Sequence, residues 1–222
     1  MECIVVSHTS AIRGARAERC SYAAVTWRPL DKREQCRVLA SCAPNKTAID
    51  FEELARKGFW QGAEGEELHI LMSDPSHVSR KSGLRCHVIS RPLPAGAIMR
   101  VGAGLYCCSP AFATLLYSEG RSLPEVYALV MELLGIYSLP AEATLPIAWG
   151  GVWPDFTDRH NVEQEHCRCE PAVTMRELRA VAAWATGRRY ATFRRAVEYA
   201  LSGSASPMET VMAGMFSIPM RW

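Results

Sequence analysis

Three residues that can bind a transition metal lie close together in the second half of the chain. His166, Cys167 and Cys169 offer one imidazole and two thiols, and imidazole nitrogen and thiolate sulfur are ligands that zinc prefers. Zinc fingers normally add a second spaced pair of ligands, and the neighbouring sequence has none. The segment is therefore either a three-ligand zinc site or a polar loop, and the missing pair favours the loop.

A second stretch carries concentrated positive charge from four arginines. These are Arg188, Arg189, Arg194 and Arg195. On a helix Arg188 and Arg195 lie near one face, so the charge forms a broad patch that could meet phosphate. The alternative is a solvated face opposite a buried apolar stripe that includes Phe193. The modest net charge of +2 favours the solvated face, but any contact with nucleic acid is expected at these arginines.

Glu209 belongs to Ser206-Pro-Met-Glu209, which begins the last predicted helix. Ser206 suits the N-cap and Pro207 the first helical position, while the Glu209 carboxylate can reach back to the cap amide. A metal-dependent nuclease needs clustered carboxylates and usually a lysine, and no lysine of this chain has an acidic residue two positions before it. Glu209 is therefore interpreted as part of a helix cap.

The familiar enzyme signatures are missing from the sequence. Gly102-Ala-Gly104 lacks the third glycine of a dinucleotide site and is interpreted as a turn between strands. The sequence contains no Gly-x-Ser-x-Gly, no Gly-Lys-Ser/Thr and no His-Glu-x-x-His motif.

Composition predicts a globular chain. The 222 residues are 49% apolar and 22% charged, which is enough to bury a core. No apolar run approaches about 18 residues and the N-terminus lacks a signal peptide, so we expect no membrane association and a cytoplasmic location. The nine cysteines are odd in number and irregularly spaced, which predicts reduced thiols used as small apolar residues.

The elements that must position these residues predict an α+β fold, in which a small, mostly antiparallel sheet is covered by helices and followed by a helical C-terminal segment. Short apolar or alternating runs predict strands, and the segment between Ser21 and Thr47 is expected to be a loop with brief structure. The predicted strands are Cys3 to Val6, Leu68 to Met72, Cys86 to Ser90, Ala97 to Val101 and Leu105 to Cys108. The predicted helices are Ala11 to Ala17, Asp50 to Gly58, Ser109 to Glu119, Ser122 to Gly135, Thr174 to Thr186, Arg188 to Leu201 and the one beginning at Ser206.

Several of these segments together resemble a known family. The succession of Val6-Ser-His-Thr-Ser-Ala11, Leu68-His-Ile-Leu-Met72, the run 86–94 and Gly104-Leu-Tyr-Cys-Cys-Ser-Pro110 resembles the effector half of AbiEi-type antitoxins. Ser206-Pro-Met-Glu209 resembles the start of the nuclease domain in actinobacterial proteins similar to very-short-patch-repair endonucleases. The resemblance implies an AbiEi-like domain over 1–137, an irregular connection over 138–173, and a helical segment over 174–222 that ends in the first helix of a truncated nuclease domain.

Two functions follow from the resemblance. The first is a non-catalytic, antitoxin-like regulatory protein of bacterial defence or of a mobile element. Its partner would be a cognate toxin or another protein, or DNA, and this chain would need no cofactor. The alternative is the N-terminal fragment of a metal-dependent DNA endonuclease, in which Glu209 would help to hold Mg²⁺ and the catalytic core would lie beyond residue 222. The apolar end from Met215 to Trp222 adds the expectation of a homodimer through the C-terminal helix.

Overall fold

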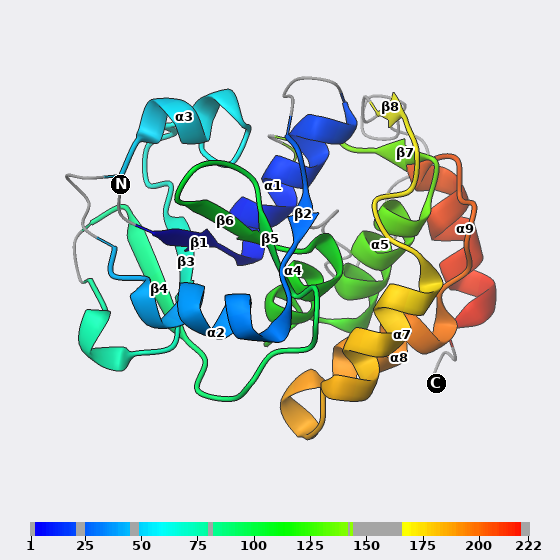
Figure 1. The fold of residues 1–222 in the computed structure, drawn as a ribbon. Helices are drawn as coiled ribbons and strands as arrows, with labels where there is room; N and C mark the ends of the chain where they lie inside the picture. Colours follow the sequence, from blue (N-terminus) through cyan, green and yellow to red (C-terminus); the bar gives the residue numbers. More distant parts are fainter. Residues whose placement is uncertain are drawn as a thin grey trace.

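The computed structural model describes residues 3–20, 25–44, 49–79, 82–141, 143 and 166–218. A β-sheet lies on one side of the molecule and a group of helices on the other, with α1 and α4 between them (Figure 1). The predicted α+β class is confirmed.

The sheet has six strands in the order β2-β5-β6-β1-β3-β4. Three of the neighbouring pairs are antiparallel, whereas β1 with β6 and β3 with β4 are parallel. The sheet is therefore mostly antiparallel, as predicted, with two parallel exceptions. The strands are β1 (Ile4–Val6), β2 (Arg28–Pro29), β3 (Leu68–Met72), β4 (Leu84–Val88), β5 (Ile98–Arg100) and β6 (Leu105–Cys108).

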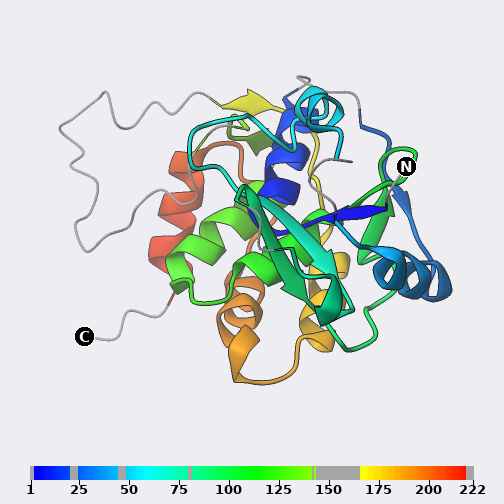
Figure 2. The ribbon, with the colours of Figure 1, turned by 90° about the vertical axis from the view of Figure 1, so that its left-hand side faces the viewer.

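Helices pack against the sheet, and most elements after residue 109 are helices (Figure 2). The predicted helix starts are confirmed at Ser109, Thr174 and Ser206, where each side chain accepts a hydrogen bond from the backbone N–H three residues later. The helices are α1 (His8–Arg19), α2 (Lys32–Ser41), α3 (Phe51–Arg56), α4 (Pro110–Tyr117), α5 (Leu123–Leu134), α7 (Met175–Trp184), α8 (Ala191–Tyr199) and α9 (Pro207–Ser217), with short 3-10 turns η2 (Pro75–His77) and η3 (Arg188–Tyr190).

Helix α2 corrects the prediction of a loop between residues 21 and 47. Asp31 is its N-cap and Glu34 its third residue, and each side chain accepts a hydrogen bond from the other's backbone N–H. Only Gln35, Val38 and Leu39 of this helix are buried. With only two apolar residues buried and charged residues around them, the helix has no clear hydrophobic periodicity, so the sequence did not predict it. Residues 21–24 and 45–48 lie outside the described residues.

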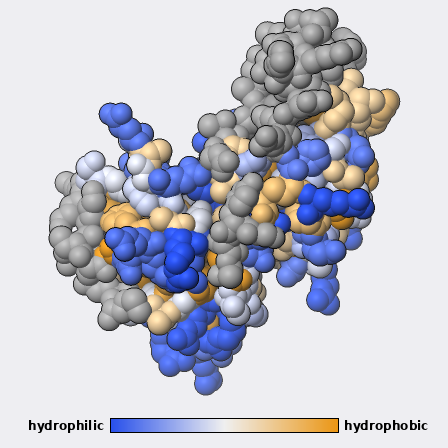
Figure 3. Space-filling model, turned by 90° about the horizontal axis from the view of Figure 1, so that it is seen from above, coloured by the Kyte–Doolittle hydropathy of each residue, from blue (hydrophilic) through white to orange (hydrophobic). Residues whose placement is uncertain are grey.

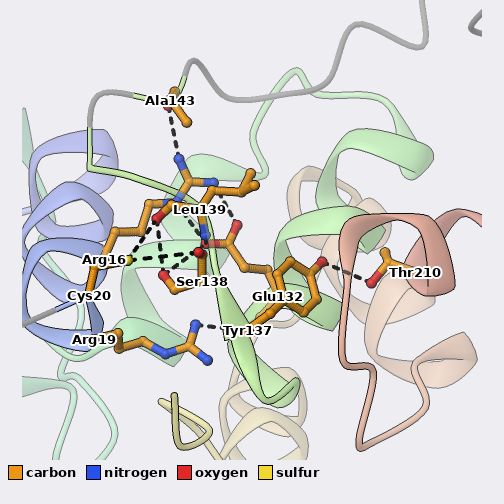
Figure 4. A network of polar contacts seen from close by, with 9 residues as sticks. All are labelled: Arg16, Arg19, Cys20, Glu132, Tyr137, Ser138, Leu139, Ala143 and Thr210. Carbon is orange, nitrogen blue, oxygen red and sulfur yellow. Dashed lines mark hydrogen bonds and ion pairs between the residues drawn. The ribbon is translucent and has the colours of Figure 1, made fainter. Parts of the chain in front are cut away.

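The hydrophobic core continues from the sheet into the C-terminal helices. Buried side chains of the strands, α1, α4 and α5 form one cluster with those of α7 and α8. Helix α9 packs on α5, and the hydroxyls of Tyr137 and Thr210 lie 2.9 Å apart (Figure 4). The last helix thus docks on the rest of the chain.

A disulfide joins the end of α1 to the later part of the predicted connection. Strands β7 (Tyr137–Ser138) and β8 (Cys167–Arg168) form a second, two-stranded sheet, and Cys167 is bonded to Cys20 at the end of α1. The other seven cysteines are free. The prediction of reduced thiols is therefore wrong for Cys20 and Cys167, because chain folding brings together two cysteines 147 positions apart. Residues 142 and 144–165 of the connection lie outside the described residues.

The surface seen from above alternates between hydrophilic residues and small hydrophobic patches (Figure 3). None of the helices in the described part of the chain has the length and apolar character needed to cross a membrane.

Candidate metal centre

Three histidines from distant parts of the sequence gather beside the sheet. In the ranges that the structure describes, His8, His69 and His87 form the one group of three or more potential metal-ligating side chains, and their ligand atoms all lie within 4.8 Å of one another. All three side chains are partly buried. Imidazole nitrogens at this spacing are suited to a transition-metal ion.

The register of two parallel strands positions His69 and His87. On β3 and β4, His69 is aligned with Arg85 and Leu71 with His87, so the two histidines are diagonal neighbours on one face of the sheet. His69 Nδ1 and His87 Nε2 are 3.0 Å apart. In the metal-free protein this distance corresponds to one N–H···N hydrogen bond. If the donor ring changes tautomer, so that its proton sits on the other ring nitrogen, both of these nitrogens are available as metal ligands and both imidazoles stay neutral.

The start of α1 brings His8 to the same place. The Ser7 N–H donates to the His69 carbonyl at 2.9 Å, and the His69 N–H donates to Ser10 Oγ at 3.2 Å. These two bonds fix the first turn of α1 against β3. The His8 ring stacks on His87, with centroids 3.6 Å apart, and its centroid lies 5.5 Å from that of His69.

The backbone of His8 is unusual. Its φ of +49° is the one positive value of a non-glycine residue among those described. Such conformations are uncommon for residues with a side chain, and they cluster at functional sites. Ser7 is the N-cap of α1, but its hydroxyl makes no cap hydrogen bond and lies 2.9 Å from His8 Nδ1. Donation from His8 Nδ1–H to Ser7 leaves Nε2 as an acceptor, which is the arrangement that orients metal-binding histidines.

The site keeps its imidazoles neutral. Burial lowers the pKa of His69 to about 3 and the pKa of His87 to about 4, with a further lowering from the charge of Arg85. Burial also lowers the pKa of His8 well below its ordinary value, and the other two histidines add to this effect. Neutral imidazole is the form that binds metals.

Ion pairs surround the three histidines. Arg85 and Arg189 lower the pKa of His87, and the carboxylates of Glu119 and Glu67 raise it. Each of the arginines near the site has a carboxylate partner. The pairs are Arg13 with Glu66, Arg85 with Glu67, and Arg189 with Glu119. The rim of the site therefore carries both signs of charge.

Arg189 is thus placed near the histidines, and the other predicted arginines have different surroundings. Arg194 donates to the carbonyls of Ala185 and Gly187. It therefore connects the end of α7 with the start of η3. Arg188 and Arg195 are exposed. Two members of the predicted patch are therefore engaged within the chain, and a contact with nucleic acid stays a prediction.

The predicted zinc ligands do not come together. Cys167 Sγ is bonded to Cys20, so it offers no thiolate, and His166, Cys167 and Cys169 are absent from the metal-ligating groups of the described residues. The three-ligand zinc site, the less favoured of the two sequence interpretations, would need Cys167 as a free thiolate, and here Cys167 is in a disulfide. Burial raises the pKa of the remaining Cys169 thiol, although Arg19 nearby lowers it.

Glu209 takes part in the helix cap, but its carboxylate binds the N–H of the residue before the predicted one. Its N–H donates to Ser206 Oγ at 3.2 Å, and its carboxylate accepts from the Ala205 N–H at 2.7 Å, one residue before the cap. Within the described residues Glu209 belongs to no metal-ligating group of three or more. A role in holding Mg²⁺ stays a prediction about a longer protein.

Sequence reasoning missed the histidine site because its three members lie in separate segments. His8 follows a strand, and His69 and His87 lie within strands, so no local spacing identifies them as ligands. The parallel register of β3 with β4 and the start of α1 beside β3 are needed to bring them together. Two histidines within predicted strands are the one available signal, and that signal alone gives no pairing.

Comparison with models of protein families, with curated proteins and with solved structures finds no match to this chain. The function is therefore argued from the site itself.

Proposed function

We propose that this protein binds a transition-metal ion, with Zn²⁺ as the best-suited example, through His8, His69 and His87. The observation that carries the proposal is the approach of three imidazole ligand atoms to within 4.8 Å of one another. Zinc–nitrogen bonds of about 2.0–2.1 Å in a tetrahedron separate the nitrogens by roughly 3.3 Å. The His69 and His87 nitrogens are already 3.0 Å apart, so metal binding needs only a small adjustment there.

Three nitrogen ligands leave one position of a tetrahedral ion open. Closed structural zinc sites have four protein ligands, whereas catalytic sites have three and hold water in the fourth position. A zinc-bound water loses its proton near neutral pH and becomes a nucleophile. The chemistry that this site would support best is therefore hydrolysis of an ester or phosphate ester by metal-activated water. Arg85 and Arg189 lie near enough to His87 to lower its pKa, so they would also be near a negatively charged substrate at the metal.

Cobalt substitution tests this proposal. The metal-free protein is titrated with Co²⁺, and visible absorption reports the coordination number of the ion. We expect the intense bands of a four-coordinate ion for the wild type and their loss in His69→Gln, with retention in the control His77→Gln. His77 contacts the Cys42 carbonyl, outside the cluster. The same samples are assayed with p-nitrophenyl acetate and bis-p-nitrophenyl phosphate. Binding without turnover would limit the function to metal binding, and no cobalt signal would overturn both parts.

A second candidate function is the antitoxin-like regulatory role, and the outer face of α9 favours it. Met212, Met215 and Phe216 are exposed there, and Phe216 is 84% accessible. An exposed apolar group of this kind is typical of a protein interaction surface. The partner would be a second copy of this chain or a protein such as a cognate toxin. The endonuclease alternative has no comparable support, because Glu209 caps a helix.

Sedimentation velocity tests the homodimer. We expect the wild type to self-associate and Phe216→Ser to shift the protein to the monomer. Leu201→Ser is the control, since Leu201 is an exposed apolar residue outside α9. A monomeric wild type at micromolar concentration would exclude the homodimer, and equal effects of the two variants would exclude a specific role of α9.

A further inference from the structure

A groove of about 380 Å³ lies between α2 and the β2-β5-β6 end of the sheet. The histidine site is at the other end of the sheet, on β3 and β4, and the two sites share no residue. The groove is lined by Arg28, Leu30, Glu34, Arg37, Val38, Ser41, Arg100 and Tyr106. Its volume falls within the range of small-molecule sites, about 300–1,000 Å³.

One wall of the groove is a row of side chains across three strands. Arg28 is directly opposite Arg100, and Arg100 is directly opposite Tyr106, so all three project from the same face of the sheet. Like charges placed directly opposite each other on neighbouring strands destabilise a sheet. The Arg28 and Arg100 pair therefore has an energetic cost, which Glu34 offsets at Arg28 and which an anion would offset at Arg100.

The other wall is one face of α2. Glu34, Arg37, Val38 and Ser41 recur at three- and four-residue steps, which places them on one side of the helix. Glu34 pairs with Arg28 at 3.2 Å. Among the described residues, neither Arg37 nor Arg100 has an ion-pair partner. Arg100 Nε donates to the Gly102 carbonyl at 3.3 Å. The other N–H groups of Arg100 and the guanidinium of Arg37 are left for a ligand.

A buried glutamine fixes the distance between the two walls. Gln35 Oε1 accepts from the Ile98 N–H at 2.8 Å, and its Nε2 donates to the Pro94 carbonyl at 3.1 Å. Gln35 is only 1% exposed, so both ends of its amide are satisfied inside the protein. The helix is therefore held to the sheet independently of any ligand, and the groove is preformed.

We propose that this groove binds a nucleoside 5′-monophosphate. The guanidinium groups of Arg37 and Arg100 match the oxygens of a phosphate group, which they bind by charge-assisted hydrogen bonds. The half-buried Tyr106 ring provides the surface on which an aromatic base packs, and the buried side chains of Leu30 and Val38 form the apolar floor beside it. The combination of an aromatic residue with two arginines that have no carboxylate partner among the described residues distinguishes this ligand from a simple anion. This site is independent of the metal ion.

Calorimetric titration of the full chain with AMP, GMP, CMP and UMP tests the proposal, with inorganic phosphate and ribose 5-phosphate as probes that lack the base. We expect at least one nucleotide to bind tenfold or more tightly than either probe. Equal binding of phosphate and nucleotides, or no binding of any of them, would overturn the proposal.

Variants on the two walls locate the site. Arg37→Gln and Arg100→Gln should each weaken nucleotide binding by about tenfold or more, the size of a lost charge-assisted hydrogen bond. Tyr106→Leu should remove the preference for nucleotide over ribose 5-phosphate. The matched control is Arg33→Gln, an exposed arginine of α2 that does not line the groove. An equal loss in Arg33→Gln and Arg37→Gln would show that general positive charge, and not this groove, is responsible.

Discussion

Arg16 and Glu132 form a bidentate ion pair in the interior of the protein. Arg16 Nε donates to Glu132 Oε1 at 2.8 Å and Arg16 Nη2 to Oε2 at 2.6 Å, and the two side chains are only 1% and 2% exposed (Figure 4). The remaining groups are also satisfied, because Arg16 donates to the Ala143 carbonyl and Glu132 accepts from the Leu139 N–H. The pair joins α1 to α5, between residues 116 positions apart in the sequence.

Glu132→Gln should destabilise the protein by about 3–5 kcal/mol, because it leaves the Arg16 charge buried without its counter-charge. Urea unfolding followed by circular dichroism measures this change. Glu198→Gln, which alters an exposed carboxylate on α8, should change the free energy of unfolding by less than about 0.5 kcal/mol. A similar small effect for Glu132→Gln would contradict the buried pair.

The disulfide between Cys20 and Cys167 should be detectable by thiol labelling. Under denaturing conditions without reductant, mass spectrometry should show seven alkylated cysteines, and reduction should raise the number to nine. The variant Cys20→Ser/Cys167→Ser should be less stable by about 2–5 kcal/mol, since the bond closes a long loop. Cys36→Ser, at an exposed free thiol, serves as the control. Nine labelled cysteines without reductant would refute the bond.

Gly14→Ala should destabilise the protein although Gly14 lies within helix α1. Alanine normally stabilises a helix relative to glycine by about 0.5–1 kcal/mol. Here a Cβ atom would lie 2.1 Å from the ring of Phe59, which is fully buried, so the ring or the helix would have to shift. We expect a loss of about 1–3 kcal/mol in thermal or urea unfolding. Gly102→Ala is the matched control, since its Cβ meets no atom closer than 3.4 Å. Stabilisation by Gly14→Ala would show that α1 packs differently.

Stability should fall in alkaline solution because of Tyr137. Burial raises the pKa of Tyr137, and the nearby Glu132 carboxylate adds to the rise, while Thr210, Arg16 and Arg19 oppose it. The folded protein thus keeps this phenol neutral when the unfolded chain ionises it at about pH 10. The stabilisation is fully present below about pH 10 and is lost as the pH rises above it.

The pH dependence of unfolding in Tyr137→Phe checks this prediction. Above pH 10 the variant should lose less stability per pH unit than the wild type, although it is less stable at pH 7 without the contact to Thr210. Equal slopes in the wild type and in Tyr137→Phe would mean that Tyr137 is solvated and that α9 does not dock on it.

The helix and strand positions could be predicted where local chemistry specifies them. Ser122, Thr174 and Ser206 each precede a Glu three residues later, and each begins a helix as expected. The run from Leu68 to Met72 is buried almost throughout, and it forms a strand with the predicted bounds. These signals depend only on residues that are close together in the sequence, so a single sequence is enough to identify them.

The histidine site and the disulfide depend on contacts between distant segments. A parallel pairing of β3 with β4 places His87 beside His69, and a shift of one residue would turn one of them to the opposite face. Likewise, the approach of Cys167 to Cys20 requires β8 to return beside the end of α1. Sequence patterns predict that such segments exist, but not which of them become neighbours.

Calorimetric titration of Zn²⁺ into the metal-free protein tests the central claim most directly. The wild type should bind one ion, Glu209→Gln should bind it equally well, and His77→Gln should behave like the wild type. His69→Gln and His87→Gln should each weaken binding by a hundredfold or more, while circular dichroism confirms that both remain folded. The account would be contradicted by a wild type that binds no zinc, or by a site that survives removal of either histidine.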